Sequence, residues 1–133
     1  MHEKYLYRVL KYTENIDDGL KARDHTSTRT VCEHVESGSD YPSRFLSTSA
    51  NLEAAKLFAS KGWHQPKRIA QIDCERLRRE NPHVQFIDLR DSSVLQRYIG
   101  PDKPVVRRCA QKYAEVLIEG YVPPSCASIV LVQ

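Results

Sequence analysis

The sequence predicts an α+β fold in a single domain that spans residues 1–133. Strand-like and helix-like segments follow one another without strict alternation, which disfavours a doubly wound parallel sheet. No internal repeat or low-complexity tract interrupts them. A length of 133 residues is typical of one domain and is enough to bury a single core without disulfide or metal crosslinks.

Six segments have the composition of strands, because aromatic and β-branched residues dominate them or apolar and polar residues alternate along them. The first is Tyr-Leu-Tyr-Arg-Val-Leu-Lys-Tyr at 5–12, and turn-forming residues at 15–20 follow it. The others are expected at 44–48, 68–73, 84–89, 114–118 and 128–132.

Helical patterns fill most of the space between these strands. The clearest helix follows the second strand, where Ser49 or Asn51 can act as the N-cap and Gly62 stops the run. Apolar residues line one side of this helix, so we expect it to pack on the sheet. Further helices are expected at 31–38, 74–80 and 93–99, whereas 105–112 fits either a loop or a helix.

The composition excludes several classes of protein. A hydrophobic fraction of 41% and a charged fraction of 28% are those of an ordinary globular protein. No apolar run reaches the roughly 18 residues that would span a bilayer, and the N-terminus lacks the apolar segment of a signal peptide. We therefore expect no membrane partner and a cytoplasmic location, with export by a leaderless route left open.

Cysteine spacing argues against a metal site. The four cysteines form no C-x-x-C pair, and no histidine stands near them at the spacing of zinc ligands. We expect reduced thiols and no bound metal. The residues concerned are Cys32, Cys74, Cys109 and Cys126.

The net charge of +3 is concentrated in the middle of the chain. Residues 65–112 carry eleven basic side chains against six acidic ones. Such a surplus suits an anionic partner, either a nucleic acid or a phosphorylated cofactor. The alternative is a solvated helix face, on which Glu75 and Glu80 compensate the arginines near them.

Three short motifs together suggest a site for nicotinamide adenine dinucleotide. Arg8 lies in the first strand, Ser47-Thr48-Ser49 ends the second, and Glu115 begins the fifth. An arginine fork binds phosphate, adjacent hydroxyls hold a ribose, and a carboxylate stabilises the sugar cation formed when nicotinamide leaves. Each motif alone fits a simpler role: a surface arginine, a helix-capping segment or an outward-facing strand residue.

On these motifs the chain resembles ADP-ribosyltransferases of the Arg–Ser–Glu type, a class that includes bacterial toxins and DNA-modifying relatives. Supporting similarities are Gly-Leu-Lys-Ala at 19–22, His-Val-Glu-Ser-Gly-Ser at 34–39 and the apolar pattern that follows residue 49. The resemblance implies two small antiparallel sheets that form an NAD cleft, with flanking helices. It also implies NAD+ as co-substrate and no metal.

The resemblance also implies roles for individual residues. Arg8, Ser47 and Glu115 would be catalytic. The expected cofactor-binding set is Arg8, Ser47, Thr48, Ser49, His34 and Phe58, with Tyr41 and Phe45 as further candidates to contact the nicotinamide ring. His34 could instead cap the turn at Gly38, and Phe45 and Phe58 could be core residues. The acceptor would meet Tyr113 and Gln111.

One departure from the family pattern bears on the acceptor. Arginine-modifying members carry a second glutamate two residues before the catalytic one, and here that residue is Tyr113. A protein arginine is therefore a poor candidate. Basic residues precede Glu115 and would suit DNA, RNA or a nucleotide, on which Tyr113 could stack, and an acidic protein surface fits equally well. They are Lys103, Arg107, Arg108 and Lys112.

The expected function is mono-ADP-ribosyl transfer from NAD+ to a nucleic acid or nucleotide, or otherwise to a protein. One alternative is an NAD glycohydrolase that uses the same residues. Another is a catalytically silent module that binds a nucleotide, a nucleic acid or a partner protein. All readings that involve NAD require Arg8, Ser47 and Glu115 to converge on one cleft.

Overall fold

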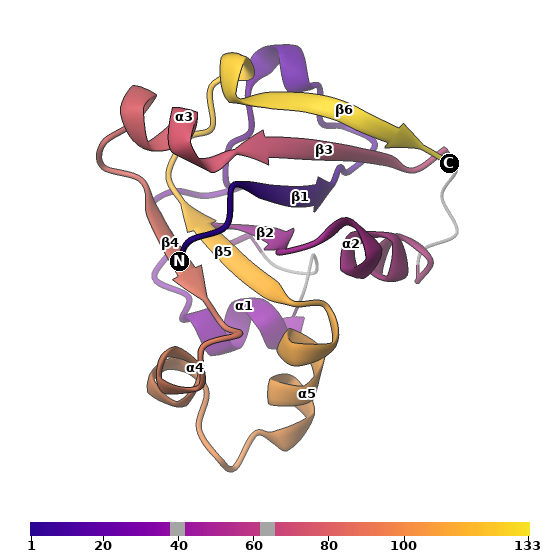
Figure 1. Ribbon diagram of the computed structural model, residues 1–133. Helices are drawn as coiled ribbons and strands as arrows, with labels where there is room; N and C mark the ends of the chain where they lie inside the picture. Colours follow the sequence, from indigo (N-terminus) through magenta and orange to yellow (C-terminus); the bar gives the residue numbers. More distant parts are fainter. Residues whose placement is uncertain (38–41, 62–65) are drawn as a thin grey trace.

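The computed structural model describes residues 1–37, 42–61 and 66–133. These residues form one six-stranded antiparallel sheet with five α-helices around it (Figure 1). The strand order across the sheet is β4-β5-β2-β1-β3-β6. The strands are β1 (Tyr5–Val9), β2 (Phe45–Ser49), β3 (Arg68–Asp73), β4 (Gln85–Asp88), β5 (Glu115–Glu119) and β6 (Ala127–Val132).

The helices agree closely with the sequence pattern. They are α1 (Val31–Ser37), α2 (Leu52–Ala59), α3 (Cys74–Glu80), α4 (Ser92–Tyr98) and α5 (Pro104–Lys112), and the 3₁₀ turns are η1 (Ile16–Asp18) and η3 (Pro124–Cys126). The segment left open between loop and helix is α5, which begins at Pro104, a residue suited to a first helical turn. None of the helices within the described ranges is long and apolar enough to cross a membrane.

The first strand is shorter than expected because the chain turns after Val9. The Lys11 backbone N–H donates to the Glu14 carboxylate, and the Glu14 N–H donates to the Lys11 carbonyl. These two bonds close a turn where the sequence pattern had suggested strand up to residue 12. The turn carries the Glu14 carboxylate back toward β1.

The expectation of two separate sheets is wrong for the described residues, which form one sheet. Its two halves, β4-β5-β2 and β1-β3-β6, are joined by the pairing of β1 with β2, whose register is the single pair Tyr7–Ser49. By contrast, β1 pairs with β3 over five positions, and β2 pairs with β5 over five. The halves therefore diverge from a narrow junction (Figure 1).

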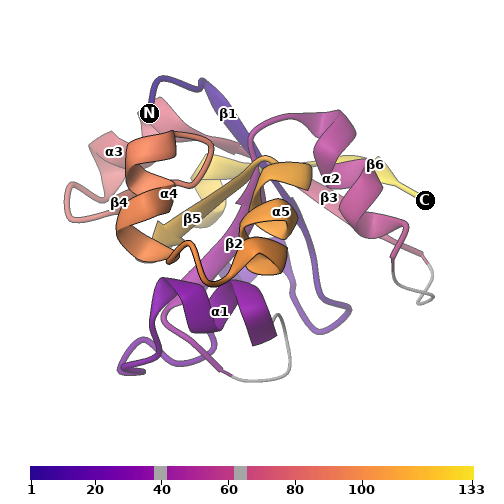
Figure 2. The same ribbon diagram turned by 90° about the horizontal axis from the view of Figure 1, so that it is seen from below.

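Two apolar clusters occupy opposite faces of the β2–β5 half. On β5, Val116 and Ile118 belong to one cluster and Leu117 to the other, and all three are fully buried. Buried residues of α4 and α5 join the Leu117 cluster, and Figure 2 shows α1, α4 and α5 gathered over this half. Because β5 is buried on both faces, its first residue, Glu115, is held by a well-packed strand.

Helix α2 contacts both β1 and β2 and so covers the junction. Asn51 is its N-cap, and the side-chain oxygen accepts the Ala54 N–H at 2.8 Å, which decides between the two cap residues expected. Ala54, Ala55 and Ala59 are the buried residues of the helix. The expected stop at Gly62 lies outside the described residues, and Ser60 is the C-cap.

Replacing Asn51 tests how much this cap stabilises the fold. Asn51→Ala leaves the Ala54 N–H without its side-chain acceptor, and we expect the free energy of unfolding to fall by about 1 kcal/mol. Asn51→Asp retains an acceptor oxygen and serves as the matched control, with stability near that of the wild type. Urea denaturation of the three proteins measures the difference, and equal losses in both variants would contradict a capping role.

Candidate functional site

The Arg8 guanidinium lies where the two halves of the sheet diverge. Its Nη1 donates to the Ser47 carbonyl oxygen at 2.9 Å, so it connects β1 to β2 beyond their last paired residues. Its Nε and Nη2 donate to the two carboxylate oxygens of Glu14 at 3.2 and 3.0 Å. Arg8 is only 7% exposed, and the ion pair and hydrogen bonds stabilise its buried charge.

Ser47 is linked to a buried histidine. His34 Nε2 lies 2.7 Å from Ser47 Oγ, and His34 Nδ1 lies 2.5 Å from Ser43 Oγ. Ser43 Oγ also accepts the Phe45 backbone N–H at 3.3 Å. Helix α1 thus places an imidazole between two serines of the segment that leads into and forms β2.

Glu115 lies beside Ser47 at the start of β5. Glu115 is directly opposite Ser49 in the β2–β5 register, and Ser47 is two residues before Ser49 in β2. Since side chains alternate between faces along a strand, all three side chains share one face. Glu115 is 8% exposed. Burial raises the pKa of its carboxyl to about 7, against the opposing effects of a hydrogen bond from Ser47 and the positive charges of Arg8 and Lys61.

The pKa of His34 determines the charge of the imidazole. Burial, assisted by the charges of Arg8 and Lys11, lowers the pKa of His34 to about 4, so the imidazole is neutral at pH 7. A neutral imidazole has one protonated and one unprotonated ring nitrogen, so one of its two serine partners accepts a hydrogen bond from it and the other donates to it.

The turn before Glu115 has a strained backbone. Ala114 has φ of 47°, the left-handed conformation that an alanine adopts at a cost of about 1 kcal/mol. Its N–H donates to the Gln111 carbonyl and its own carbonyl accepts the Ala50 N–H, which hold the conformation. The tight turn directs the chain from α5 into β5 and fixes where the Glu115 side chain starts.

The structure brings Arg8, His34, Ser47 and Glu115 into one constellation but separates Thr48 from it. The Thr48 hydroxyl donates to the Val116 carbonyl on the opposite face of β2, so it points away from Ser47 and Glu115. The cofactor contact expected of Thr48 has no support in this geometry. Its hydroxyl fastens β2 to β5 instead.

The aromatic residues expected near nicotinamide have different environments. Phe45 is buried in the core and lies edge-on to the His34 ring, with the centroids 5.7 Å apart. Phe58 is 38% exposed and packs edge-on against Tyr113 at 5.2 Å. Tyr41, together with residues 38–40, lies outside the described residues.

The two residues expected to meet the acceptor lie on the α5–β5 side of Glu115. Gln111 is exposed, whereas Tyr113 is only 4% exposed. Tyr113 therefore offers little ring surface on which a base could stack. Both residues line a surface pocket described below.

The described residues at the centre of the expected site do not line an open cleft for a dinucleotide. Arg8, His34, Ser49 and Glu115 are all buried, and Ser47 alone of the central residues is partly exposed. No group of three or more histidine, cysteine, aspartate or glutamate side chains within the described part of the chain is arranged to hold a metal ion.

Sequence reasoning did not identify three contributors to this site. Glu14 lies in a turn, Ser43 precedes β2, and Lys61 follows α2, and none belongs to a recognisable motif. The one available signal was the six-residue separation of Glu14 from Arg8, which a tight turn converts into an ion pair. The other two contacts depend on tertiary packing.

The comparisons with known proteins support the fold. No protein-family model matches the chain, and no curated protein matches it. Among solved structures the chain is similar to EcPltA, a toxin-like ADP-ribosyltransferase subunit, with a TM-score of 0.61 and 15% sequence identity over 99% of this chain and 85% of that one. At this identity the similarity shows the fold alone: the described residues fold in a similar way to EcPltA.

The burial of Glu115 has a consequence for stability. Its pKa is about 7 in the folded protein against 4.5 for the free side chain, so between these values the folded protein holds a proton that the unfolded chain has lost. Wild-type stability should therefore fall, relative to Glu115→Gln, as the pH rises from about 5 to about 8, by at most roughly 3 kcal/mol. Urea denaturation of both proteins at several pH values measures this, and parallel profiles would contradict the raised pKa.

Proposed function

We propose that the protein is a mono-ADP-ribosyltransferase that cleaves NAD+ at the glycosidic bond to nicotinamide. The observation that carries the proposal is the convergence of three residues remote in sequence: Arg8 donates to the Ser47 carbonyl at 2.9 Å, and Ser47 shares one face of the β2–β5 pair with Glu115. The fold shared with EcPltA supports it independently, because that protein is an ADP-ribosyltransferase subunit.

In the proposed reaction the bond between C1 of the ribose and the nicotinamide nitrogen breaks, and its electron pair leaves with nicotinamide. The ribose becomes a cation of oxocarbenium type. The ionised carboxylate of Glu115 stabilises this cation, and the low polarity of its buried surroundings strengthens the interaction. An acceptor nucleophile then bonds to C1.

Ser47 and His34 have a positioning role in this scheme. Ser47 holds the carboxylate through its hydroxyl, and His34 holds Ser47 through Nε2 at 2.7 Å. Because His34 is neutral, it adds no positive charge that would oppose formation of the ribose cation. Ser47, which is partly exposed, is also placed to contact the ribose hydroxyls.

Arg8 is the proposed anchor for the pyrophosphate. A guanidinium carries five N–H groups, and Arg8 uses three of them on Glu14 and Ser47. The second N–H groups of Nη1 and Nη2 suit two phosphate oxygens. The hydrogen bond from Arg8 to the Ser47 carbonyl would then connect the pyrophosphate end of the cofactor site to the ribose end.

The same residues would serve an NAD glycohydrolase if water were the acceptor. Incubation with NAD+ labelled in its adenylate part separates the two activities: a transferase makes the label macromolecule-bound, and a hydrolase leaves it in free ADP-ribose. A catalytically silent binding module would release no nicotinamide at any protein concentration.

The raised pKa of Glu115 predicts the pH dependence of activity. The carboxylate must be ionised to stabilise a cation, so kcat/KM for nicotinamide release should rise as the pH increases through about 7 and then level off. Glu115→Gln should lower kcat/KM by about 10²–10³ and abolish that rise. Turnover that is unchanged in this variant would refute the catalytic assignment.

Adjacent hydroxyls on opposite faces of β2 provide a second test. Ser47→Ala removes the bonds to Glu115 and His34, and nicotinamide release should fall by about tenfold or more. Thr48→Val removes the bond to the Val116 carbonyl, and it should lower the free energy of unfolding by about 1 kcal/mol with activity retained. Steady-state kinetics and urea denaturation distinguish them, and the reverse pattern would contradict the assignment of faces.

A further inference from the structure

A surface pocket of about 480 Å³ is lined mostly by residues that precede Glu115 in the sequence. Three cationic side chains line it, those of Lys61, Arg108 and Lys112, together with Gln111 and Tyr113. Tyr113 is two residues before Glu115, and the charge of Lys61 acts on the Glu115 carboxyl. The pocket is therefore adjacent to the proposed catalytic carboxylate.

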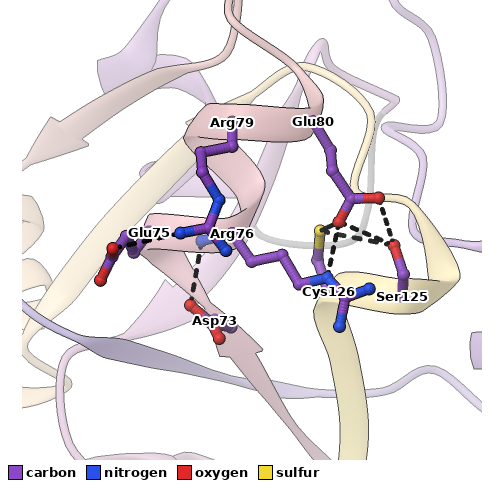
Figure 3. Close-up of polar contacts among 7 residues, drawn as sticks. All are labelled: Asp73, Glu75, Arg76, Arg79, Glu80, Ser125 and Cys126. Atoms are coloured by element: carbon purple, nitrogen blue, oxygen red, sulfur yellow. Dashed lines mark hydrogen bonds and ion pairs between the residues drawn. The ribbon is translucent and has the colours of Figure 1, made fainter.

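Some of the positive charge elsewhere in the basic middle of the chain is compensated by ion pairs. On α3, Arg76 pairs with Glu80 at 2.8 Å and Arg79 with Glu75 at 3.2 Å (Figure 3). This part of the surplus is the solvated helix face considered from the sequence. It does not constitute an anion site.

Two of the four basic residues that precede Glu115 are also engaged. Lys103 pairs with Glu36 at 3.0 Å, and Arg107 donates twice to the Ile99 carbonyl. In contrast, Lys61, Arg108 and Lys112 form no ion pair with any carboxylate of the described segments. Three cations that lack a carboxylate partner within the part of the chain that the structure describes thus line one pocket.

The ring of Tyr113 organises two of these cations. Lys61 Nζ lies 4.9 Å from the ring centroid and Lys112 Nζ lies 5.5 Å from it. Phe58 supports the ring edge-on. Cation–π attraction to the Tyr113 ring therefore holds the ammonium groups of Lys61 and Lys112 near each other in the pocket.

We propose that this pocket binds a phosphate group of a nucleic-acid acceptor and so presents that acceptor to the reacting ribose. The inference rests on the proposed transferase function and names its substrate class. One arginine and two lysines form a compact set of cations that suits the concentrated charge of a phosphate. A volume of about 480 Å³ accommodates a nucleotide-sized group, and the Gln111 amide can both donate to and accept from a base edge.

In the transfer step, the glycosidic bond breaks and its electron pair leaves on nicotinamide, and a nucleophilic atom of the nucleic acid then forms a bond to C1 of the ribose cation. The proton of the nucleophile passes to the Glu115 carboxylate and then to solvent. No oxidant, reductant or metal is needed for the atoms and charges to balance.

The test compares two double substitutions that each remove two positive charges. Arg108→Gln/Lys112→Gln neutralises the pocket, and Arg79→Gln/Arg97→Gln neutralises exposed arginines of α3 and α4 that do not line it. Fluorescence anisotropy, without NAD+, follows binding of labelled single-stranded DNA and RNA of about ten nucleotides and of an acidic peptide of similar charge.

We expect the wild type to bind the oligonucleotides more tightly than the peptide. The pocket substitution should weaken oligonucleotide binding by about tenfold or more and reduce the salt slope by about 1 for each lost phosphate contact. The α3/α4 substitution should change the affinity less than about twofold. The proposal is overturned by no oligonucleotide binding, by equal weakening in both double variants, or by equal or tighter binding of the acidic peptide.

A second measurement separates this inference from the proposed function. Label transfer from NAD+ to the oligonucleotide should be lost in Glu115→Gln, while that variant still binds the oligonucleotide. Pocket-dependent binding without any nicotinamide release by the wild type would refute the transferase and leave a nucleic-acid-binding pocket. Nicotinamide release without pocket-dependent binding would refute the pocket alone.

Discussion

The Arg8 guanidinium is the interaction on which the arrangement of the site depends. Strands β1 and β2 pair at Tyr7–Ser49 and then diverge, and Arg8 donates to the Ser47 carbonyl just beyond that junction. This contact fixes the distance between Ser47 and β1 beyond the paired residues. Glu14 fixes the other side of the guanidinium, so the position of the charge is set by both halves of the sheet.

The second constraint is the cost of burying Glu115. A carboxyl that is 8% exposed would ordinarily remain protonated well above its usual pKa, and the Ser47 hydroxyl and the charges of Arg8 and Lys61 oppose that effect. The resulting pKa of about 7 leaves the group able to ionise near neutrality. The interactions that position the carboxylate therefore also determine its charge.

Local sequence predicted much of the fold because the relevant signals are local. Alternating apolar residues marked β3, and Asn51, one of the two candidate caps, marked the start of α2. The number of sheets could not be predicted in this way. It depends on how many residues of β1 and β2 pair, and that is decided by the turn at Glu14 and the packing of the two halves.

In the candidate site, too, the sequence indicated the residues but not the features that depend on tertiary packing. The resemblance singled out Arg8, Ser47 and Glu115, and the structure brings Arg8 into contact with Ser47 and places Ser47 and Glu115 on one face of the β2–β5 pair. It could not tell which face of β2 carries each hydroxyl, and the register with β5 turns Thr48 away. Nor could it separate Arg107, which bonds a backbone carbonyl, from Arg108, which lines the pocket, because that depends on the packing of α5.

The most direct measurement of the central claim is a heteronuclear NMR titration of Glu115→Gln with NAD+. If one site binds the dinucleotide, the Arg8 side-chain Nε–H and the backbone amides of Ser47 and position 115 should shift together with a single dissociation constant. Shifts confined to surfaces remote from all three residues, or no shifts at saturating NAD+, would contradict the account.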